Sequence, residues 1–292
     1  MTFSLGTFAS PVDGTALATY TWDAVQAPVG VVQVAHGLAE HAGRYDRLAQ
    51  ALTAAGFVVH ATDHRGHGKS ISGVPGDFGD AGFEALVADV AAHGASLAAA
   101  HPGLPLFLVA HSMGSFAAQS VLLTDSDQYC GVVLSGSTAL AELGAAMAAG
   151  AQGPDAPAGL EAFNVGFEQR TGYEWLSRDE AEVDAYVADP LCGFDLPEAT
   201  VPALFGAAGT LADPSALAAI RPGLPVLIAS GVDDPLAGGG QLVELLGQRY
   251  RDAGLTDVTV RLYEGARHEI FNETNRDEVT ADVVAWLDSH LP

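Results

Sequence analysis

The chain has 292 residues, of which 49% are hydrophobic and 16% are charged, so it holds enough apolar material for a sizeable core and intrinsic disorder is excluded. Its 12 basic and 36 acidic residues give a net charge of −24, which argues against nucleic acid and an anionic membrane as partners, because both attract clustered Lys and Arg. Two cysteines are too few for a disulfide framework, and the first residues show no signal peptide, so we expect a soluble, cytoplasmic protein.

Short apolar runs alternate with amphipathic segments along the chain. The runs typical of strands are residues 29–34, 57–60, 104–109, 131–134 and 225–229, together with 258–262, where apolar and polar residues alternate. The segments whose apolar spacing predicts helices are residues 45–55, 83–100, 115–123 and 277–287. Because strands separated by helices form βαβ units, this order predicts an α/β fold with a mostly parallel, twisted sheet flanked by helices.

The alternation breaks between residues 137 and 219. This stretch has no clean buried strand and holds several Pro and Gly. Its helical pieces are expected around Phe163, Trp175 and Tyr186. A segment of this length inside a compact fold is typical of a functional insertion. We therefore expect a helical cap at 137–219, inserted into a core formed by 1–136 and 220–292.

A strand-to-helix turn carries the strongest chemical signal. Ser112 follows an apolar run and opens a predicted helix, which is the context of a nucleophile elbow. Ala110 and Gly114 flank it, and small residues are needed there because the strand and helix backbones come close. The usual pattern has Gly at both places, but the single methyl of Ala110 keeps the steric logic. The alternative is an ordinary helix N-terminus with a serine near its cap.

A serine hydroxyl needs a base, and the base needs an orienting acid. In this type of fold the chain order is nucleophile, acid, base. His268 follows the last predicted strand and precedes the final helix, whereas His290, at the chain end, is typical of a helix-end cation. Asp233 and Asp234 both follow the preceding strand. We choose Asp234, which stands directly before a proline, and interpret Asp233 as a turn residue.

Acyl transfer also needs N–H donors directed at the developing oxyanion. One is expected from Met113, the residue after the nucleophile, at a helix N-terminus that favours negative charge. The other is expected from Leu38, because Gly37 permits the turn that would direct its N–H inward.

Several segments of the chain together resemble the monoacylglycerol lipase and lysophospholipase branch of the α/β-hydrolase fold. They are His36-Gly-Leu-Ala-Glu-His-Ala-Gly-Arg-Tyr45, Asp63-His-Arg-Gly-His-Gly-Lys-Ser70, Ala110-His-Ser-Met-Gly114 and Gly265-Ala-Arg-His-Glu269. Asp189-Pro-Leu-Cys-Gly193 resembles bacterial members of that branch. The resemblance implies Ser112, Asp234 and His268 as a catalytic triad, with Leu38 and Met113 as oxyanion donors.

The resemblance also gives a role to the residues that follow the first buried strand. Glu40, His41 and Arg44 would brace the oxyanion loop and contact the polar head of a substrate. The alternative is an exposed helix start with an i,i+4 Glu–Arg pair. For the segment 63–70 we expect a structural role, with Arg65 paired to a carboxylate. No cofactor and no metal are indicated, because the histidines of this segment lie in a glycine-rich turn without further ligands.

The resulting hypothesis is a serine hydrolase that cleaves carboxylic esters through an acyl-enzyme, of monoacylglycerol lipase type. The alternatives are a lysophospholipase or another carboxylesterase on the same scaffold, and a non-catalytic pseudo-hydrolase that only binds a ligand. The expected partner is a small lipid-like ester, with no stable membrane insertion and only transient interfacial contact through the cap. Candidates for an acyl pocket are Leu140, Leu143, Met147, Phe163, Val165, Phe167 and Trp175.

Overall fold

The computed structural model describes residues 3–150 and 159–292, and an eight-stranded sheet runs through them. The order across the sheet is β1-β2-β4-β3-β5-β6-β7-β8. The strands are β1 (Ser4–Ala9), β2 (Ala16–Trp22), β3 (Gly30–Ala35), β4 (Phe57–Thr62), β5 (Leu106–His111), β6 (Gly131–Ser135), β7 (Val226–Gly231) and β8 (Val258–Tyr263). From β4 to β8 all neighbours are parallel, which confirms the prediction of a mostly parallel sheet.

The sheet begins with an antiparallel hairpin that the sequence did not predict. β1 pairs with β2, and β2 pairs with β4, in each case antiparallel. Along β1 nearly every residue is exposed, so the strand carries no apolar run that could signal it. The predicted strands of the parallel part are found within about two residues of their expected ends.

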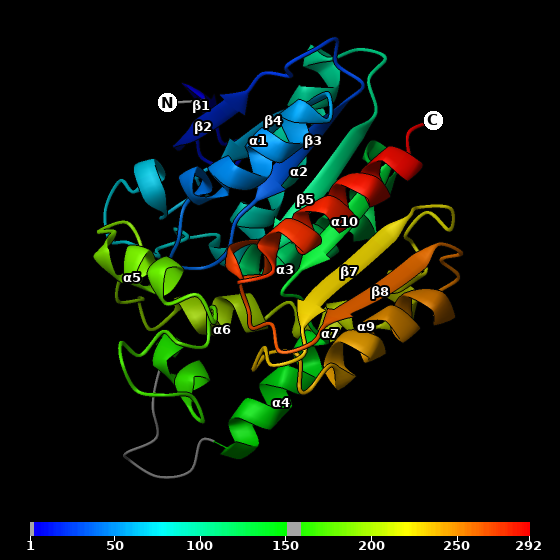
Figure 1. The fold of residues 1–292 in the computed structure, drawn as a ribbon. Helices are drawn as coiled ribbons and strands as arrows, with labels where there is room; N and C mark the ends of the chain where they lie inside the picture. The colour runs from blue at the N-terminus through cyan, green and yellow to red at the C-terminus, as the bar shows by residue number, and fades with distance from the viewer. Residues whose placement is uncertain (1–2, 151–158) are drawn as a thin grey trace.

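Helices cover both faces of the sheet (Figure 1). α1 (Asp46–Ala54) and α10 (Arg276–Ser289) pack on one face, and α2 (Gly82–Ala100), α3 (Met113–Asp125) and α9 (Gln241–Asp252) pack on the other. The four helices predicted from apolar spacing are confirmed, whereas α9 was not predicted. Two layers of buried apolar side chains thus enclose the sheet, which explains why its central strands are buried along their whole length and are mostly apolar.

Among the described residues, α2 is the one helix that is long and apolar enough to cross a membrane, judged by length and composition. Phe83, Leu86, Val90 and Leu97 are nevertheless buried against the sheet and α3. Asp89 on the same helix is also buried and binds Arg65, the carboxylate partner expected for that arginine. α2 is therefore packed as a core helix of the fold.

The segment between β6 and β7, which we call the insert (residues 136–225), lies at one end of the sheet (Figure 1). Its helices are α4 (Leu140–Gly150), η4 (Gly159–Asn164), α5 (Glu180–Ala188), α6 (Thr200–Phe205), α7 (Ala208–Leu211) and α8 (Pro214–Leu217). Helical pieces thus lie around Phe163 and Tyr186 as predicted, but Trp175 lies in a turn. The described insert holds no strand. Residues 151–158 of the predicted cap lie outside the described residues.

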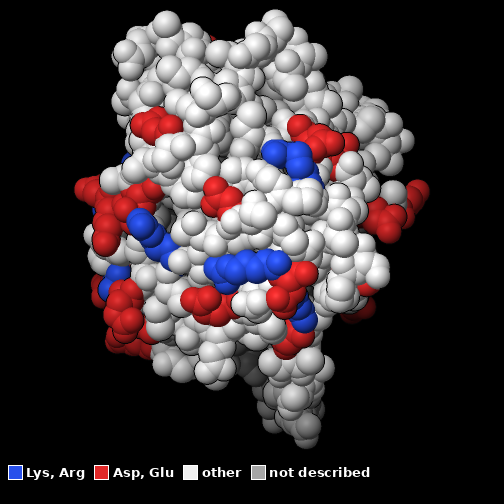
Figure 2. All heavy atoms as spheres, turned by 90° about the vertical axis from the view of Figure 1, so that its right-hand side faces the viewer, with Lys and Arg blue, Asp and Glu red and all other residues white. Residues whose placement is uncertain are grey.

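On the face in Figure 2, most of the Lys and Arg side chains lie beside Asp or Glu side chains. Arg261 pairs with Asp282, Arg249 with Glu142, and Arg276 with Asp179.

Candidate active site

Ser112 lies at a sharp turn between β5 and α3. Its backbone has φ 50° and ψ −121°, a conformation that is strained for a residue with a side chain. The N–H of Ser112 donates to the carbonyl oxygen of Ser135 at 2.9 Å, which fixes the turn to the neighbouring strand β6. A Cβ atom on Gly114 would overlap the carbonyl oxygen of Ala35, so the helix can approach the sheet only with glycine there. This close approach leaves the Ser112 side chain half-buried at the end of the strand.

Three side chains from distant parts of the chain form one hydrogen-bonded relay. Ser112 Oγ lies 2.9 Å from His268 Nε2, and His268 Nδ1 lies 2.9 Å from Asp234 Oδ2. The other carboxylate oxygen of Asp234 accepts the N–H of Leu236 at 2.8 Å, which holds the carboxylate in place. Asp233 is exposed and its N–H donates to the carbonyl oxygen of Ala266. The structure therefore brings Asp234, and not Asp233, to the imidazole.

His290 is not part of this hydrogen-bonded relay. It caps the C-terminus of α10 and lies 3.1 Å from the carboxylate of Asp257. This is the helix-end arrangement expected for it.

The charge state of His268 is set by its surroundings. Burial alone lowers the pKa of a histidine, but the negative charge of Asp234 outweighs it and raises the pKa of His268 above the ordinary 6.5, with smaller contributions from Glu269 and Glu40. With a raised pKa, the imidazole takes up a proton readily. The hydrogen bond to Asp234 keeps a proton on Nδ1 and leaves Nε2 free to accept one.

The loop after β3 lies against the nucleophile. Leu38 and Met113 both line the cavity into which Ser112 opens. The N–H of Met113 belongs to the first turn of α3, where N–H groups have no acceptor within the helix. The loop also contains Ala39, a non-glycine residue with φ 53°. The hydroxyl of Tyr186 and the N–H of Gly193, both in the insert, donate to the carbonyl oxygen of Ala39 at 2.9 Å and so hold this strained residue in place.

Glu40 and Arg44 connect the same loop to the loop that carries His268. Glu40 Oε1 accepts the N–H of Gly37 at 2.5 Å and the hydroxyl of Tyr45 at 2.7 Å. Arg44 donates to Glu40 and, through two nitrogens, to both carboxylate oxygens of Glu269. Burial alone raises the pKa of Glu269, but the charge of Arg44 outweighs it and lowers this pKa to about 2. The cluster is not an exposed helix start, because Glu40 is 3% exposed.

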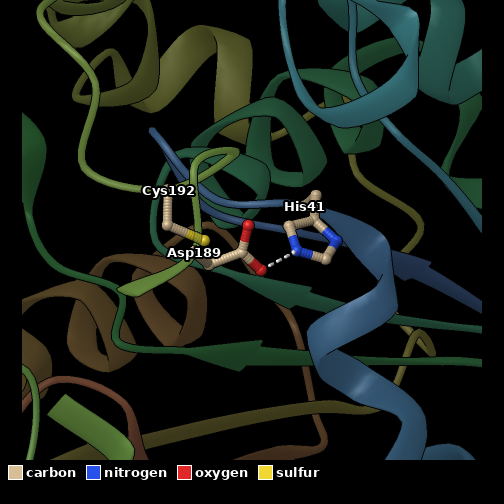
Figure 3. Close-up of side chains that lie close together, drawn as sticks. All are labelled: His41, Asp189 and Cys192. Carbon is tan, nitrogen blue, oxygen red and sulfur yellow. Dashed lines mark hydrogen bonds and ion pairs between the residues drawn. The ribbon is translucent and has the colours of Figure 1, made fainter. Parts of the chain in front are cut away.

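His41 contacts the insert rather than the nucleophile. Its Nε2 lies 3.0 Å from Asp189 Oδ2, and the thiol of Cys192 lies beside them (Figure 3). These three side chains have ligand types that suit a metal. However, His41 Nδ1 accepts the N–H of Gly43 at 3.1 Å, so in the neutral ring Nε2 carries the proton and donates to Asp189. The geometry therefore describes a hydrogen bond between loop and insert better than a set of free metal ligands.

The relay opens onto a cavity of about 590 Å³ between the sheet end and the insert. Most of its lining is apolar, and besides Ser112 and His268 it holds the polar side chains of Glu40, His111, Glu198 and Glu269. Of the expected acyl-pocket residues, the structure places Leu143, Met147, Phe163 and Trp175 in the lining. It does not place Leu140, Val165 and Phe167 there: Leu140 is buried in the core, Val165 is 67% exposed, and Phe167 packs under the guanidinium of Arg267.

Some residues at the site were not singled out from the sequence. Tyr45 and Tyr186 support the loop after β3 through their hydroxyls, and Glu269 completes the cluster around Arg44. Glu269 could have been found from its place beside His268. Tyr186 gave no such signal, because its partner Ala39 lies 147 residues away in the chain.

The fold and this site define an α/β-hydrolase of the serine hydrolase class. The family model described as serine aminopeptidase, S33, matches residues 26–275, and the chain belongs to this family. It is 34% identical to a monoacylglycerol lipase of Mycolicibacterium smegmatis, over 96% of this chain and 95% of the relative. It is 32% identical to the monoglyceride lipase of Homo sapiens, over 93% of this chain and 85% of the relative.

Solved structures give the same result. A thermostable carboxyl esterase from Bacillus coagulans superposes with a TM-score of 0.86 at 28% identity and covers 100% of both chains. A monoacylglycerol lipase of Paleococcus ferrophilus superposes with a TM-score of 0.69 at 27% identity, covering 94% of this chain and 99% of that one. The protein is thus a serine ester hydrolase similar to monoacylglycerol lipases.

Proposed function

We propose that the protein hydrolyses monoacylglycerols through an acyl-enzyme on Ser112. The observation that carries this proposal is the relay Ser112–His268–Asp234, with both hydrogen bonds at 2.9 Å, at the mouth of a largely apolar cavity of about 590 Å³. An apolar cavity of this size suits an alkyl chain, whose burial drives binding, and the few polar side chains in its lining suit a glycerol head.

The reaction starts with attack of Ser112 Oγ on the ester carbonyl carbon. His268 Nε2 takes the hydroxyl proton as the C–O bond to the serine forms, and Asp234 stabilises the imidazolium through Nδ1. The tetrahedral oxyanion lies against the N–H groups of Leu38 and Met113. Its collapse breaks the ester bond, and His268 passes the proton to the departing glycerol oxygen. Water, deprotonated by His268, then releases the fatty acid and restores Ser112.

Glu40, Arg44 and His41 act on this reaction through the oxyanion loop. Glu40 accepts the N–H of Gly37, the residue before Leu38. This bond holds the main chain next to the Leu38 N–H, the proposed oxyanion donor. Arg44 joins Glu40 to Glu269, which keeps the oxyanion loop and the base loop at a fixed separation. His41 ties the same loop to Asp189 in the insert. Glu40 also lines the cavity and is in a position to contact the head group.

The segment 137–219 acts as a cap over the cavity in this proposal. Leu143, Met147 and Phe163 from this segment line the cavity and would cover the acyl chain. We further propose that the cap makes transient contact with a lipid interface, where it collects substrate. The negative net charge of −24 favours neutral glycerides over anionic lipids. Cys130 and Cys192 are free thiols, which fits the proposed cytoplasmic location.

A peptide substrate is a weaker candidate, although the family description names an aminopeptidase. Recognition of a peptide N-terminus needs a buried carboxylate that is free to bind an ammonium group. Glu40 and Glu269, the buried carboxylates in the cavity lining, are both bonded to Arg44, and the third carboxylate of the lining, Glu198, is exposed. An uncharged head group therefore suits the buried polar part of the cavity better.

The test is a substrate panel with a matched pair of serine variants. The panel holds 1-monooleoylglycerol, a lysophosphatidylcholine, p-nitrophenyl butyrate and an amino-acid p-nitroanilide. We expect monoacylglycerol to have the highest kcat/KM, and Ser112→Ala to lose about 10⁶ in turnover. The control Ser120→Ala lies on the same helix α3, where its hydroxyl donates to the Phe116 carbonyl, and should keep full activity.

Each outcome of the panel has a definite meaning. Preference for the lysophospholipid or the simple ester would replace monoacylglycerol with that substrate class on the same catalytic residues. Hydrolysis that survives Ser112→Ala would refute the nucleophile. An absence of both turnover and reaction with a fluorophosphonate would indicate a non-catalytic relative.

A further inference from the structure

The imidazole of His268 is in contact with two other rings. The ring of His111 has its centroid 4.7 Å from that of His268, and the indole of Trp175 has its centroid 4.8 Å away with the planes tilted by 38°. Burial lowers the pKa of His111 to about 4, so this ring is neutral at neutral pH. Trp175 comes from the insert and is 4% exposed, and its indole also contacts the ring of Phe163.

Backbone hydrogen bonds fix the position of Trp175 relative to the base. The N–H of His268 donates to the carbonyl oxygen of Trp175 at 3.3 Å, and the N–H of Glu269 donates to that of Leu176 at 2.8 Å. The guanidinium of Arg267 donates to two more carbonyl oxygens of the insert, those of Glu174 at 2.6 Å and Ser177 at 3.1 Å. These bonds join the insert turn to the loop of His268, so the main chain of Trp175 is fixed relative to the base, and packing holds the buried indole against the imidazole.

We propose that Trp175 is a positioning residue for His268, whose indole face holds the imidazole toward Ser112 and stabilises its protonated form during catalysis. This inference rests on the proposed function, in which His268 is the general base. A cation within about 6 Å of a tryptophan centroid is attracted by the ring face, and a centroid distance of 4.8 Å lies inside that limit. During turnover the imidazolium is present while the tetrahedral intermediate forms and collapses, and in the free enzyme it is present below the pKa of His268. A contact that favours the imidazolium therefore stabilises the tetrahedral intermediate and also raises the pKa of the free base.

Other charged and titratable groups also act on the same imidazole. Asp234 bonds Nδ1 from the loop after β7, while Glu269 on the base loop and Glu40 on the loop after β3 act at longer range. His111 faces it from the end of β5. None of these groups changes when Trp175 is replaced, so their contribution is common to all the variants that are compared below.

The experiment compares Trp175→Phe with Trp175→Leu. Both changes keep an apolar side chain, and neither removes a hydrogen bond of the indole, since Trp175 Nε1 has no partner among the described residues. Phenylalanine keeps an aromatic face and leucine does not. We expect the apparent pKa in the pH profile of kcat/KM for p-nitrophenyl butyrate to fall by about half a unit in Trp175→Leu and by less in Trp175→Phe. We also expect kcat to fall about tenfold in Trp175→Leu, with KM changed less than kcat.

Phe163→Leu is the matched control. Phe163 lines the same cavity and contacts the indole at a centroid distance of 5.1 Å, but no ring contact joins it to His268. It should alter the KM for long-chain esters and leave the apparent pKa unchanged. Where a leucine variant is too slow for kinetics, the pKa of His268 is read by NMR of labelled histidine in each Trp175 variant.

Several outcomes would overturn the inference. They are a Trp175→Leu variant whose pKa is unchanged or higher, a phenylalanine variant as impaired as the leucine variant, and a Phe163→Leu variant with the same pKa shift. The Ser112→Ala comparison separates this failure from failure of the proposed function. If the Trp175 variants keep the apparent pKa and kcat of the unmodified protein while Ser112→Ala is inactive, the proposed ester hydrolase stands and only the role of the indole is refuted.

Discussion

Replacement of Arg44 by methionine tests the network that braces the oxyanion loop. Arg44 lies between Glu40 and Glu269, which are 3% and 6% exposed, and methionine keeps part of its aliphatic volume but none of its charge. Removal of one partner from a buried ion pair costs about 3–5 kcal/mol, because it leaves a buried charge uncompensated. A single domain is stable by only about 5–15 kcal/mol, so Arg44→Met should lose a large share of the free energy of unfolding.

The pH dependence of this loss follows from the pKa of Glu269. Arg44 lowers that pKa to about 2 from 4.5, so ionised Glu269 contributes stability above pH 4.5 that is lost as the pH falls toward 2. Without Arg44, burial raises the pKa of Glu269 and its ionised form opposes folding. The deficit of Arg44→Met should therefore be large at pH 8 and smaller at pH 5. Urea unfolding at both values measures it, and esterase kcat should fall by up to about 10²–10³ if the oxyanion donor is displaced.

Arg47→Met is the matched control. Arg47 lies three residues further along, pairs with Glu182, and its side chain is 47% exposed. An exposed pair of this kind contributes about 0–1 kcal/mol, so the control should unfold nearly as the unmodified protein does. Equal losses in the two variants, or a deficit in Arg44→Met that does not change with pH, would refute the reasoning.

Further predictions concern the base, the elbow and the cavity. kcat/KM for p-nitrophenyl butyrate should rise with pH through an apparent pKa above 6.5, because Asp234 raises the pKa of the base; a profile that is flat between pH 5 and 8 would contradict this. Gly114→Ala should yield little folded protein by circular dichroism, because its Cβ would overlap the main chain, whereas Ala110→Gly should fold normally; the reverse order would contradict the elbow geometry. Met147→Trp should shift the preference of the enzyme to shorter acyl chains, since this side chain lines the cavity; an unchanged chain-length profile across C4 to C18 esters would contradict that assignment.

The parallel part of the fold could be predicted because its strands are buried on both faces. Such strands appear as continuous apolar runs, and each is followed by a helix with clear apolar spacing. β1 gave no signal because its residues are exposed on nearly every position. α9 has buried residues at Val243, Leu246 and Tyr250, a spacing that predicts a helix, but Gly247 interrupts the pattern. That glycine lies against β8, where a Cβ atom would lie 2.5 Å from Cγ2 of Val260, well inside van der Waals contact.

The relay residues were chosen from chain order, which works because parallel strands bring their carboxyl ends to one edge of the sheet. The choice between Asp233 and Asp234 depended on the position of the proline, and in the structure only Asp234 contacts the imidazole. The support around the relay could not be read in this way. Trp175 reaches His268 from a turn in the insert, and no local pattern indicates which side chain of such a segment will meet a loop far along the chain.

Covalent labelling of the nucleophile tests the central claim most directly. The protein is treated with a fluorophosphonate, digested, and the modified peptide is located by mass spectrometry in the unmodified protein and in His268→Ala. The account predicts one adduct per chain, on Ser112, and labelling that is slower by several orders of magnitude without the imidazole. An adduct on another residue, or equal labelling rates with and without His268, would contradict it.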